Sequence, residues 1–386
     1  MTSEPIYLDH AATTPVRESV FEAMRPFFGP RFGNASSTHR WGREARVALD
    51  EARERVARCL GAHVDEIVFT SGGTEADNLG VLGGWRVQKG NGRNAVVSTP
   101  IEHKAVLGSV HQAAAEGAEE RWIRVTRDGI VDLDAADAAI NETAALVSVM
   151  WVNNETGAIQ PVPAIGALAR ERGAVFHTDA VQAFGKVPID TRTTPFDLLS
   201  LSGHKFGAPK GIGMMFLRRG TRLAPLFFGG TQDRGRRPGT ENVAMAVGLA
   251  TAMEATLAEH AAECTRVRTL HDRLETALSE RIPDIVIHAR NAPRAPHITS
   301  VSIPGIDSES MLMALDLQGI ACSGGSACQS GSVGASHVLA AMGVPHVLAA
   351  GQLRLSVGCL TTDDAIARVA QVLPTLVAKA RGRSVS

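Results

Sequence analysis

Residues 174–205 read AVFHTDAVQAFGKVPIDTRTTPFDLLSLSGHK and contain two short apolar runs, at 174–177 and 198–201. Thr178 and Asp179 follow the first run directly, and the tetrapeptide SGHK, which ends at Lys205, follows the second. The interval between Asp179 and Lys205 has the length of one strand–helix–strand step. We therefore expect both residues at the same edge of a sheet, on nearby strands.

The same alternation of apolar runs and helical patterns extends on both sides of this stretch. Four further apolar runs lie at 66–70, 95–98, 146–152 and 212–217, and amphipathic stretches between the runs lie at 74–89, 104–116 and 162–172. Continuous apolar strands separated by helices are typical of a mostly parallel sheet that is covered on both faces. The first two thirds of the chain are therefore predicted to be an α/β domain.

The remainder of the chain has a different pattern. A long helical segment at 241–281 is followed by predicted strands at 284–288, 298–303 and 352–357 and by predicted helices at 308–317 and 362–380. This order is typical of a smaller α+β unit. We predict two domains: residues 1–255 form an N-terminal segment and the large domain, and residues 256–386 form a small C-terminal domain.

Polar residues gather at the ends of the predicted strands. Five of the six apolar runs end in a polar cluster: SGGTE at 71–75, TPIEHK at 99–104, NNE at 153–155, TD at 178–179 with Gln182 one turn later, and SGHK at 202–205. Ligands of open parallel sheets bind beyond the carboxyl ends of the strands. The clusters therefore predict one shared site.

Each cluster also has an ordinary structural interpretation. The glycine turn at 72–73 is compatible with a simple helix cap as well as with an anion site, and a lone histidine such as His103 is more often structural. Asp179 is harder to explain, because a carboxylate after an apolar strand is costly without a cationic partner. Lys205 likewise needs a partner or a chemical use.

A single cofactor explains these residues together. Pyridoxal phosphate carries one phosphate for the glycine turn, one protonated ring nitrogen for Asp179 and one aldehyde for a Schiff base with Lys205. The sequence therefore predicts a pyridoxal-phosphate enzyme.

Motifs along nearly the whole chain extend this interpretation. They are YLDHAATTP at 7–15, FGNASS at 32–37, FTSGGTE at 69–75, EHK at 102–104, VNNE at 152–155, DAVQ at 179–182, SGHK at 202–205, RPGT at 237–240, SGGSAC at 323–328 and LRLS at 353–356. In this order and spacing, the chain resembles the cysteine desulfurases, within the aspartate-aminotransferase-like (fold type I) group of pyridoxal-phosphate enzymes.

The resemblance implies roles for individual residues. His103 would stack on the pyridine ring, Asp179 would pair with its nitrogen, and Thr240 would reach the phosphate from the other subunit of a homodimer. The substrate L-cysteine would be bound through its carboxylate by Arg354, with help from Asn34. The cofactor-binding residues that it implies are Gly73, Thr74, His103, Asn154, Asp179, Gln182, Ser202, His204, Lys205 and Thr240; the substrate-binding residues are Asn34, Asn154 and Arg354; and the catalytic residues are Cys328, Lys205 and His103.

Cys328 distinguishes this family from other enzymes of the fold. It lies in a run of small residues, whereas the other four cysteines fall in strand or helix patterns and are expected to be structural. An accessible thiol suits a nucleophile. The resemblance implies that Cys328 takes the substrate sulfur as a persulfide, leaves L-alanine and passes the sulfur to an acceptor, for iron–sulfur cluster assembly or for tRNA or cofactor thiolation.

Three other functions stay open at this point. A selenocysteine lyase resembles this family in fold and cofactor site, an aminotransferase or decarboxylase of fold type I would not use Cys328, and a sulfur carrier or scaffold would retain only the fold. Two departures from better-known members are His10, where many carry asparagine, and a chain that stops soon after its last helix. The second leaves the choice of acceptor open.

Composition limits the remaining possibilities. A net charge of -1 argues against a nucleic-acid binder. An odd number of cysteines, five, without C-x-x-C spacing predicts neither a metal site nor a disulfide framework, which fits a reduced, cytoplasmic setting. No apolar stretch approaches the roughly 20 residues of a membrane helix, so we expect no membrane partner.

Overall fold

The apolar runs of the first two thirds of the chain form one sheet of seven strands, in the order β2-β8-β7-β6-β5-β3-β4. The computed structural model describes residues 4–325 and 336–382. The strands of this sheet are β2 (Ile67–Thr70), β3 (Ala95–Ser98), β4 (Glu119–Trp122), β5 (Ala144–Ser148), β6 (Val175–Asp179), β7 (Leu198–Ser202) and β8 (Gly213–Leu217). Neighbours from β4 to β7 pair in parallel, and β8 is antiparallel to both β7 and β2. The predicted mostly parallel sheet is confirmed.

Strand direction explains where the polar clusters lie. Because β8 runs opposite to its neighbours, its carboxyl end lies at the other edge of the sheet, and the run at 212–217 is the one that no polar cluster follows. The carboxyl ends of β2, β3, β5, β6 and β7 share one edge. This edge collects all five clusters.

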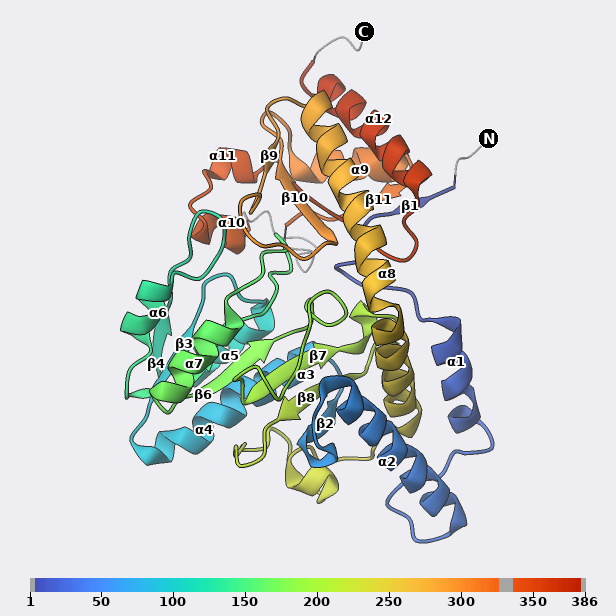
Figure 1. Cartoon of the computed structure of the whole chain (residues 1–386), viewed down its shortest axis with the longest axis vertical. Helices are drawn as coiled ribbons and strands as arrows, with labels where there is room; N and C mark the ends of the chain where they lie inside the picture. Colours follow the sequence, from blue (N-terminus) through green and yellow to red (C-terminus); the bar gives the residue numbers. More distant parts are fainter. Residues whose placement is uncertain (1–3, 326–335, 383–386) are drawn as a thin grey trace.

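Alternate residues of the strands enter two different hydrophobic cores. Val96, Leu146 and Leu198 pack on one face, together with α3 (Gly73–Asn78), the π-helical turn Leu79–Gly83, α4 (Gly84–Gln88) and α5 (Lys104–Ala115). Val97 and Val147 pack on the opposite face, with α2 (Arg40–Leu60), α6 (Leu133–Ala139), α7 (Val162–Glu171) and the first half of α8 (Val243–Arg281). Helices therefore cover both faces of the sheet (Figure 1). α1 (Glu18–Met24) packs along α8.

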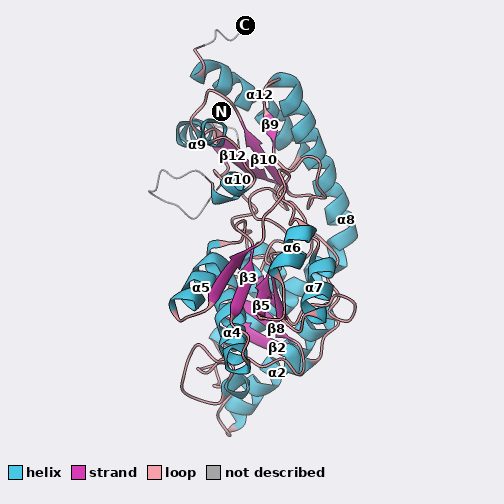
Figure 2. Cartoon of the chain, turned by 90° about the vertical axis from the view of Figure 1, so that its left-hand side faces the viewer, coloured by secondary structure: helices cyan, strands magenta, loops and turns pink. Residues whose placement is uncertain are grey.

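A second, smaller unit lies at the other end of α8 (Figure 2). Its three strands pair antiparallel in the order β12-β10-β9. The remaining elements are β1 (Ile6–Tyr7), β9 (Val286–Ile287), β10 (Ile298–Ser302), α9 (Ser308–Leu317), β11 (Ile320–Ala321), α10 (His337–Ala341), α11 (His346–Ala349), β12 (Gln352–Ser356) and α12 (Asp363–Ala380). β1 pairs in parallel with β11, which brings the N-terminal segment onto this unit.

The long helix α8 contributes to both units. Met253 packs in the core of the large sheet, and Val267 packs in the core of the small unit. The boundary that we predict near residue 255 lies between these two contacts. Ile6 and Leu8 also belong to the core of the small unit, although they precede the large domain in sequence.

Several observed elements have no counterpart among those expected from the sequence, and β4 and α2 are two of them. β4 is an edge strand with exposed Glu119 and Glu120, so it has no continuous apolar run. α2 buries mainly small side chains between charged ones, for example Ala45, Ala48 and Ala52. Leu49, Val56 and Leu60 are buried on the same face, so α2 has the spacing of an amphipathic helix. Within the described residues, no helix is long and apolar enough to cross a membrane.

Candidate active site

The shared carboxyl edge of the sheet opens into a cavity of about 360 Å³. Most of the predicted site residues line it: Gly73, Thr74, His103, Asn154, Asp179, Gln182, Ser202, His204, Lys205 and Arg354. Because they come from five different strand ends and from β12, only the fold brings them together. The cavity is the candidate active site.

Asp179 ends β6 inside the cavity with only 4% of its surface exposed. Its Oδ1 accepts the backbone N–H of Val181 at 2.9 Å. Burial raises the pKa of Asp179, while the charges of His103 and Lys205 and the Val181 N–H oppose the rise. A buried carboxylate in such a place favours a cationic ligand that can share its charge.

Lys205 lies in the helical turn that follows β7, the strand paired in parallel with β6. Its Nζ donates to the backbone oxygens of Ala11 and Ala12 at 2.7 and 2.8 Å. The N-terminal segment therefore holds the lysine amine at the cavity wall. This places Asp179 and Lys205 on adjacent strand ends at one edge, as predicted, although the connection between β6 and β7 consists of turns and contains no helix.

His204 is held by the same N-terminal segment. Its Nδ1 lies 3.0 Å from Thr13 Oγ1, and its backbone oxygen accepts the Thr14 hydroxyl at 2.8 Å. Burial and the nearby charges of Lys205 and Lys210 lower the pKa of His204 to about 4. The imidazole is therefore neutral at physiological pH and has one N–H to donate.

His103 and Gln182 form the walls on either side of Asp179. The Nδ1 of His103 accepts the Ala105 N–H at 3.2 Å and caps α5, which fixes the ring at the cavity. Gln182 donates to the Ala11 backbone oxygen at 2.8 Å and accepts from His297 Nε2 at 3.2 Å. Both side chains are therefore oriented by the protein before any ligand binds.

Gly73 and Thr74 begin α3 at the far end of the cavity. The first N–H groups of a helix have no partner within the helix and attract anions. A Cβ on Gly73 would lie 2.9 Å from Val181 Cγ2, which is closer than packed carbon atoms approach, so the turn requires glycine here. With Ser202 and His204 nearby, this end suits a phosphate.

Arg354, on β12, is the buried cation of the cavity, with 2% of its surface exposed. It donates to the Asn154 backbone oxygen at 2.8 Å and to Asp9 Oδ1 at 3.0 Å. Its Nε has no partner among the described residues. An arginine held on two sides with an unused donor suits a ligand carboxylate.

These groups fit pyridoxal phosphate. The glycine turn with Ser202 and His204 offers donors to a phosphate, Asp179 is a buried acid that favours a cationic ring nitrogen, and Lys205 offers an amine. The orphaned Nε of Arg354 leaves a donor for the substrate at the other side. The cofactor deduced from the sequence therefore agrees with the donors present.

Two predicted site residues do not line this cavity, and a third lies outside the described residues. Asn34 is exposed, and its Oδ1 accepts the N–H of Ser36 at 2.9 Å. Thr240 is exposed as well, in the segment before α8. Neither lines the cavity of its own chain. The contact of Asn34 with the substrate carboxylate and that of Thr240 with the phosphate of the other subunit therefore stay predictions. Cys328 lies outside the described residues.

The cavity is also lined by side chains to which the motifs assign no role: Asp77, Lys104, Met150, Glu155 and His337. Asp77 is nearly fully buried on α3. Its position, three residues after Thr74 on the face turned to the sheet, is the signal that could have revealed it. A charged residue at an apolar helix position is unusual unless it has a use.

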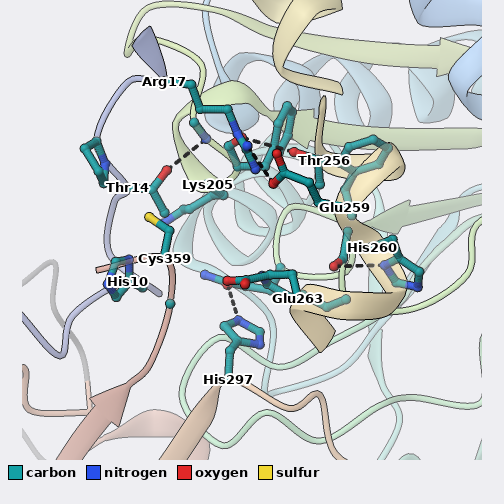
Figure 3. A pocket seen from close by; sticks show the side chains of 18 of the residues that line it. His10, Thr14, Arg17, Lys205, Thr256, Glu259, His260, Glu263, His297 and Cys359 are labelled. Atoms are coloured by element: carbon teal, nitrogen blue, oxygen red, sulfur yellow. Dashed lines mark hydrogen bonds and ion pairs between the residues drawn. The ribbon is translucent and has the colours of Figure 1, made fainter. Parts of the chain in front are cut away.

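A second cavity of about 170 Å³ lies on the other side of Lys205 and Gln182, which line both. Figure 3 shows His10, Lys205, His297 and Cys359 around it, with residues of α8 opposite. Neither ring nitrogen of His10 has a partner among the described residues, and burial lowers its pKa to about 4. The departure at His10 therefore faces this second cavity.

The described cysteines are unsuited to nucleophilic work at the first cavity. Cys59, Cys264 and Cys322 are half-buried, Cys359 is exposed, and all four are free thiols. Burial raises the pKa of Cys59 to about 11 and that of Cys322 to about 12. A thiol with so high a pKa forms little thiolate near neutral pH.

The sequence and the fold of this chain are similar to those of known proteins. The profile of the aminotransferase class-V family matches residues 6–369. A cysteine desulfurase of Gluconacetobacter diazotrophicus is 47% identical over 98% of this chain and 95% of its own length. The cysteine desulfurase NifS of Azotobacter vinelandii is 43% identical over 98% of this chain and 94% of its own. Among solved structures, a NifS-like protein superposes with a TM-score of 0.91 at 33% identity, covering 97% of this chain and 100% of the other.

Proposed function

The chain belongs to the aminotransferase class-V family, and from this premise we propose that it is a cysteine desulfurase that uses pyridoxal phosphate. The observation that carries the proposal is the cavity in which Asp179, Lys205 and Arg354 converge from β6, β7 and β12. Pyridoxal-phosphate chemistry on an amino acid needs an acid for the ring nitrogen, an amine for the aldehyde and an arginine for the substrate carboxylate. The names of the relatives favour cysteine over the other substrates considered.

Each end of the cavity has a role in holding the cofactor. Lys205 would hold the aldehyde, and Asp179 would pair with the ring nitrogen. The phosphate would be held by Gly73, Thr74, Ser202 and His204. His103 would stack on the ring. When bound, pyridoxal phosphate supplies an electron sink that stabilises negative charge at the substrate α-carbon.

Substrate positioning falls to Arg354. Its guanidinium would take the carboxylate of L-cysteine, with Asn154 beside it, while Asp9 and the Asn154 backbone oxygen keep the guanidinium in place. Once released from the cofactor, the Lys205 amine would remove the proton from the substrate α-carbon. The side chain of His103 is fixed because it caps α5. It would donate a proton from the side on which it stacks on the cofactor ring.

Cys328 would carry out the sulfur step. Its thiolate would attack the sulfur of the substrate, forming a sulfur–sulfur bond while the electrons of the broken carbon–sulfur bond stay with carbon. Protonation of that carbon leads to L-alanine, and the sulfur stays on Cys328 as a persulfide. This role rests on the resemblance of SGGSAC at 323–328 to the family motif.

The finer parts of the proposal concern partners. Thr240 is exposed and lies outside its own chain's cavity, which supports a homodimer in which it completes the site of the partner. The persulfide sulfur would pass to an acceptor protein of iron–sulfur cluster assembly or thiolation, in the cytoplasm.

Mass spectrometry of the Cys328 peptide tests the proposal. After L-cysteine is added to the holoenzyme, the peptide should gain the mass of one sulfur atom, and L-alanine should appear without an added keto acid. The Cys359→Ser variant is the matched control and should behave like the wild type, because Cys359 lies at the second cavity. An unmodified Cys328 peptide in an enzyme that makes alanine at normal rates would refute the persulfide step.

The selenocysteine alternative has its own measurement. A selenocysteine lyase would turn over selenocysteine far better than cysteine and would retain that activity in Cys328→Ser. A cysteine desulfurase loses its activity on cysteine in the same variant.

A further inference from the structure

Asp77 is a buried acid at the inner wall of the cofactor cavity. It lies on α3, one turn after Thr74, and exposes 1% of its surface. One carboxylate oxygen of Asp77, one of Asp179 and one ring nitrogen of His103 lie within 4.8 Å of one another. Oδ1 of Asp77 has no hydrogen-bond partner among the described residues. Burial of such an oxygen is costly, so its retention needs an explanation.

The histidine behind Asp77 does not neutralise it. His177 Nε2 lies 3.7 Å from Asp77 Oδ1, but it also lies 2.9 Å from Ser200 Oγ, and its Nδ1 lies 2.8 Å from Ser148 Oγ. Complete burial lowers the pKa of His177 to about 3, so the ring is neutral at physiological pH. The two serines satisfy it, and Asp77 gains no positive partner from β6 or β7.

The remaining neighbours of Asp77 differ from those of Asp179. Burial, followed by the charge of Asp179, raises the pKa of Asp77 well above its ordinary value, and a hydrogen bond with Ser200 opposes that rise. Burial also raises the pKa of Asp179, but the charges of His103 and Lys205 counteract that rise. Two buried carboxyl groups at this distance do not ionise together. Asp179 Oδ1 accepts the Val181 N–H, whereas Asp77 Oδ1 has no donor among the described residues, so the geometry places the negative charge on Asp179 and the proton on Asp77.

We propose that Asp77 stays protonated and donates its hydrogen to the carboxylate of Asp179, orienting that carboxylate toward the cofactor's ring nitrogen. The inference rests on the proposed function, in which Asp179 meets that nitrogen. A neutral acid beside Asp179 leaves one negative charge under the ring instead of two. It also supplies a donor that stabilises that charge in a buried place. Asp77 is thus a positioning residue that acts through Asp179.

Two variants of Asp77 separate this role from its alternatives. Asp77→Asn keeps the volume and a donor but cannot ionise, and Asp77→Ala loses the donor. For each holoenzyme, without L-cysteine, we would measure the dissociation constant of pyridoxal phosphate and the pH midpoint of the absorption change of the bound cofactor. Asp197→Asn is the matched control, because Asp197 accepts the Phe176 N–H at 2.9 Å at the opposite edge of the sheet.

The expected results follow from the donor. Asp77→Asn should bind the cofactor as the wild type does, with the same midpoint, because its amide N–H replaces the acid O–H. Asp77→Ala should bind roughly 10-fold more weakly or worse and shift the midpoint, because a hydrogen bond to a charged group is lost. Asp197→Asn should change neither quantity.

Two results would overturn the inference. If Asp77→Asn weakens cofactor binding tenfold or more, Asp77 acts as an anion; this comparison stands even when Asp77→Ala does not fold. If Asp77→Ala folds and keeps the wild-type dissociation constant and midpoint, Asp77 does not act on Asp179. Failure of the proposed function looks different, because the wild-type protein would then bind no pyridoxal phosphate.

Discussion

Arg354→Lys tests the substrate end of the cavity, because it keeps the charge and removes the guanidinium fork. Arg354 already donates to the Asn154 backbone oxygen and to Asp9 Oδ1, at 2.8 and 3.0 Å, and its Nε is the donor that the described residues leave unpartnered. Lysine has one nitrogen and cannot reach these two acceptors and a carboxylate in the same geometry.

The expected magnitude follows from the bonds at stake. Loss of one hydrogen bond to the charged carboxylate costs about 1.5–3 kcal/mol, which corresponds to a rise in KM of roughly 10- to 150-fold. The carboxylate of cysteine keeps its charge throughout the reaction, so Arg354 binds the ground state and the transition state alike. For such uniform binding, kcat should stay within about threefold of the wild type.

The assay is alanine formation as a function of L-cysteine concentration, with a melting curve for each variant. Arg381→Lys is the matched control, because Arg381 pairs with Asp284 at 2.9 Å on the far side of the small unit. A variant with unchanged KM would show that Arg354 does not hold the substrate. A fall in kcat at constant KM would assign it to the chemical step instead.

Three further predictions follow from the same cavity. Borohydride reduction of the yellow holoenzyme should attach the cofactor to Lys205, and a label on any other lysine would contradict the cofactor assignment. Gly73→Ala should weaken cofactor binding and cost about 1–3 kcal/mol of stability, measured by fluorescence and denaturant unfolding, because its Cβ would lie 2.9 Å from Val181 Cγ2. Burial raises the pKa of Glu102 to about 8; since its folded pKa exceeds its unfolded one, stability should fall as pH rises from about 4.5 to 8. Glu102→Gln should reduce that fall by roughly 2–4 kcal/mol, and identical slopes in both proteins would refute a neutral Glu102.

The cofactor side of the site could be predicted because strand ends mark it in the sequence. Asp179 and Lys205 each follow an apolar run, and parallel strands must bring their carboxyl ends to one edge. Even the absence of a cluster after residue 217 agrees with the observed direction of β8. The apolar runs and the polar residues after them therefore predict the same edge of the sheet that the strand directions define.

Asp77 does not follow a strand, so strand ends do not mark it; its signal in the sequence is a charged residue at an apolar position of a helix. Its partner Asp179 is close only after α3 packs on the sheet. The second cavity beside His10 likewise arises where the N-terminal segment, α8 and the chain after β12 meet. Contacts between such distant segments have no local signal in a single sequence. α2 differs from these, because Leu49, Val56 and Leu60 recur on its buried face at helical spacing, a local signal that the sequence does contain.

The division of the site among segments explains why Lys205 alone does not identify the reaction. Lys205 and Asp179 come from the large sheet and determine the cofactor class, which many reactions share. Arg354 comes from the small unit and restricts the substrate to one with a carboxylate. Neither selects sulfur. Under the proposed function that choice would fall to Cys328, because the four described cysteines lie outside the cofactor cavity. Lys205 would release the electrons of the substrate and Cys328 would accept its sulfur, so the reaction belongs to the pair.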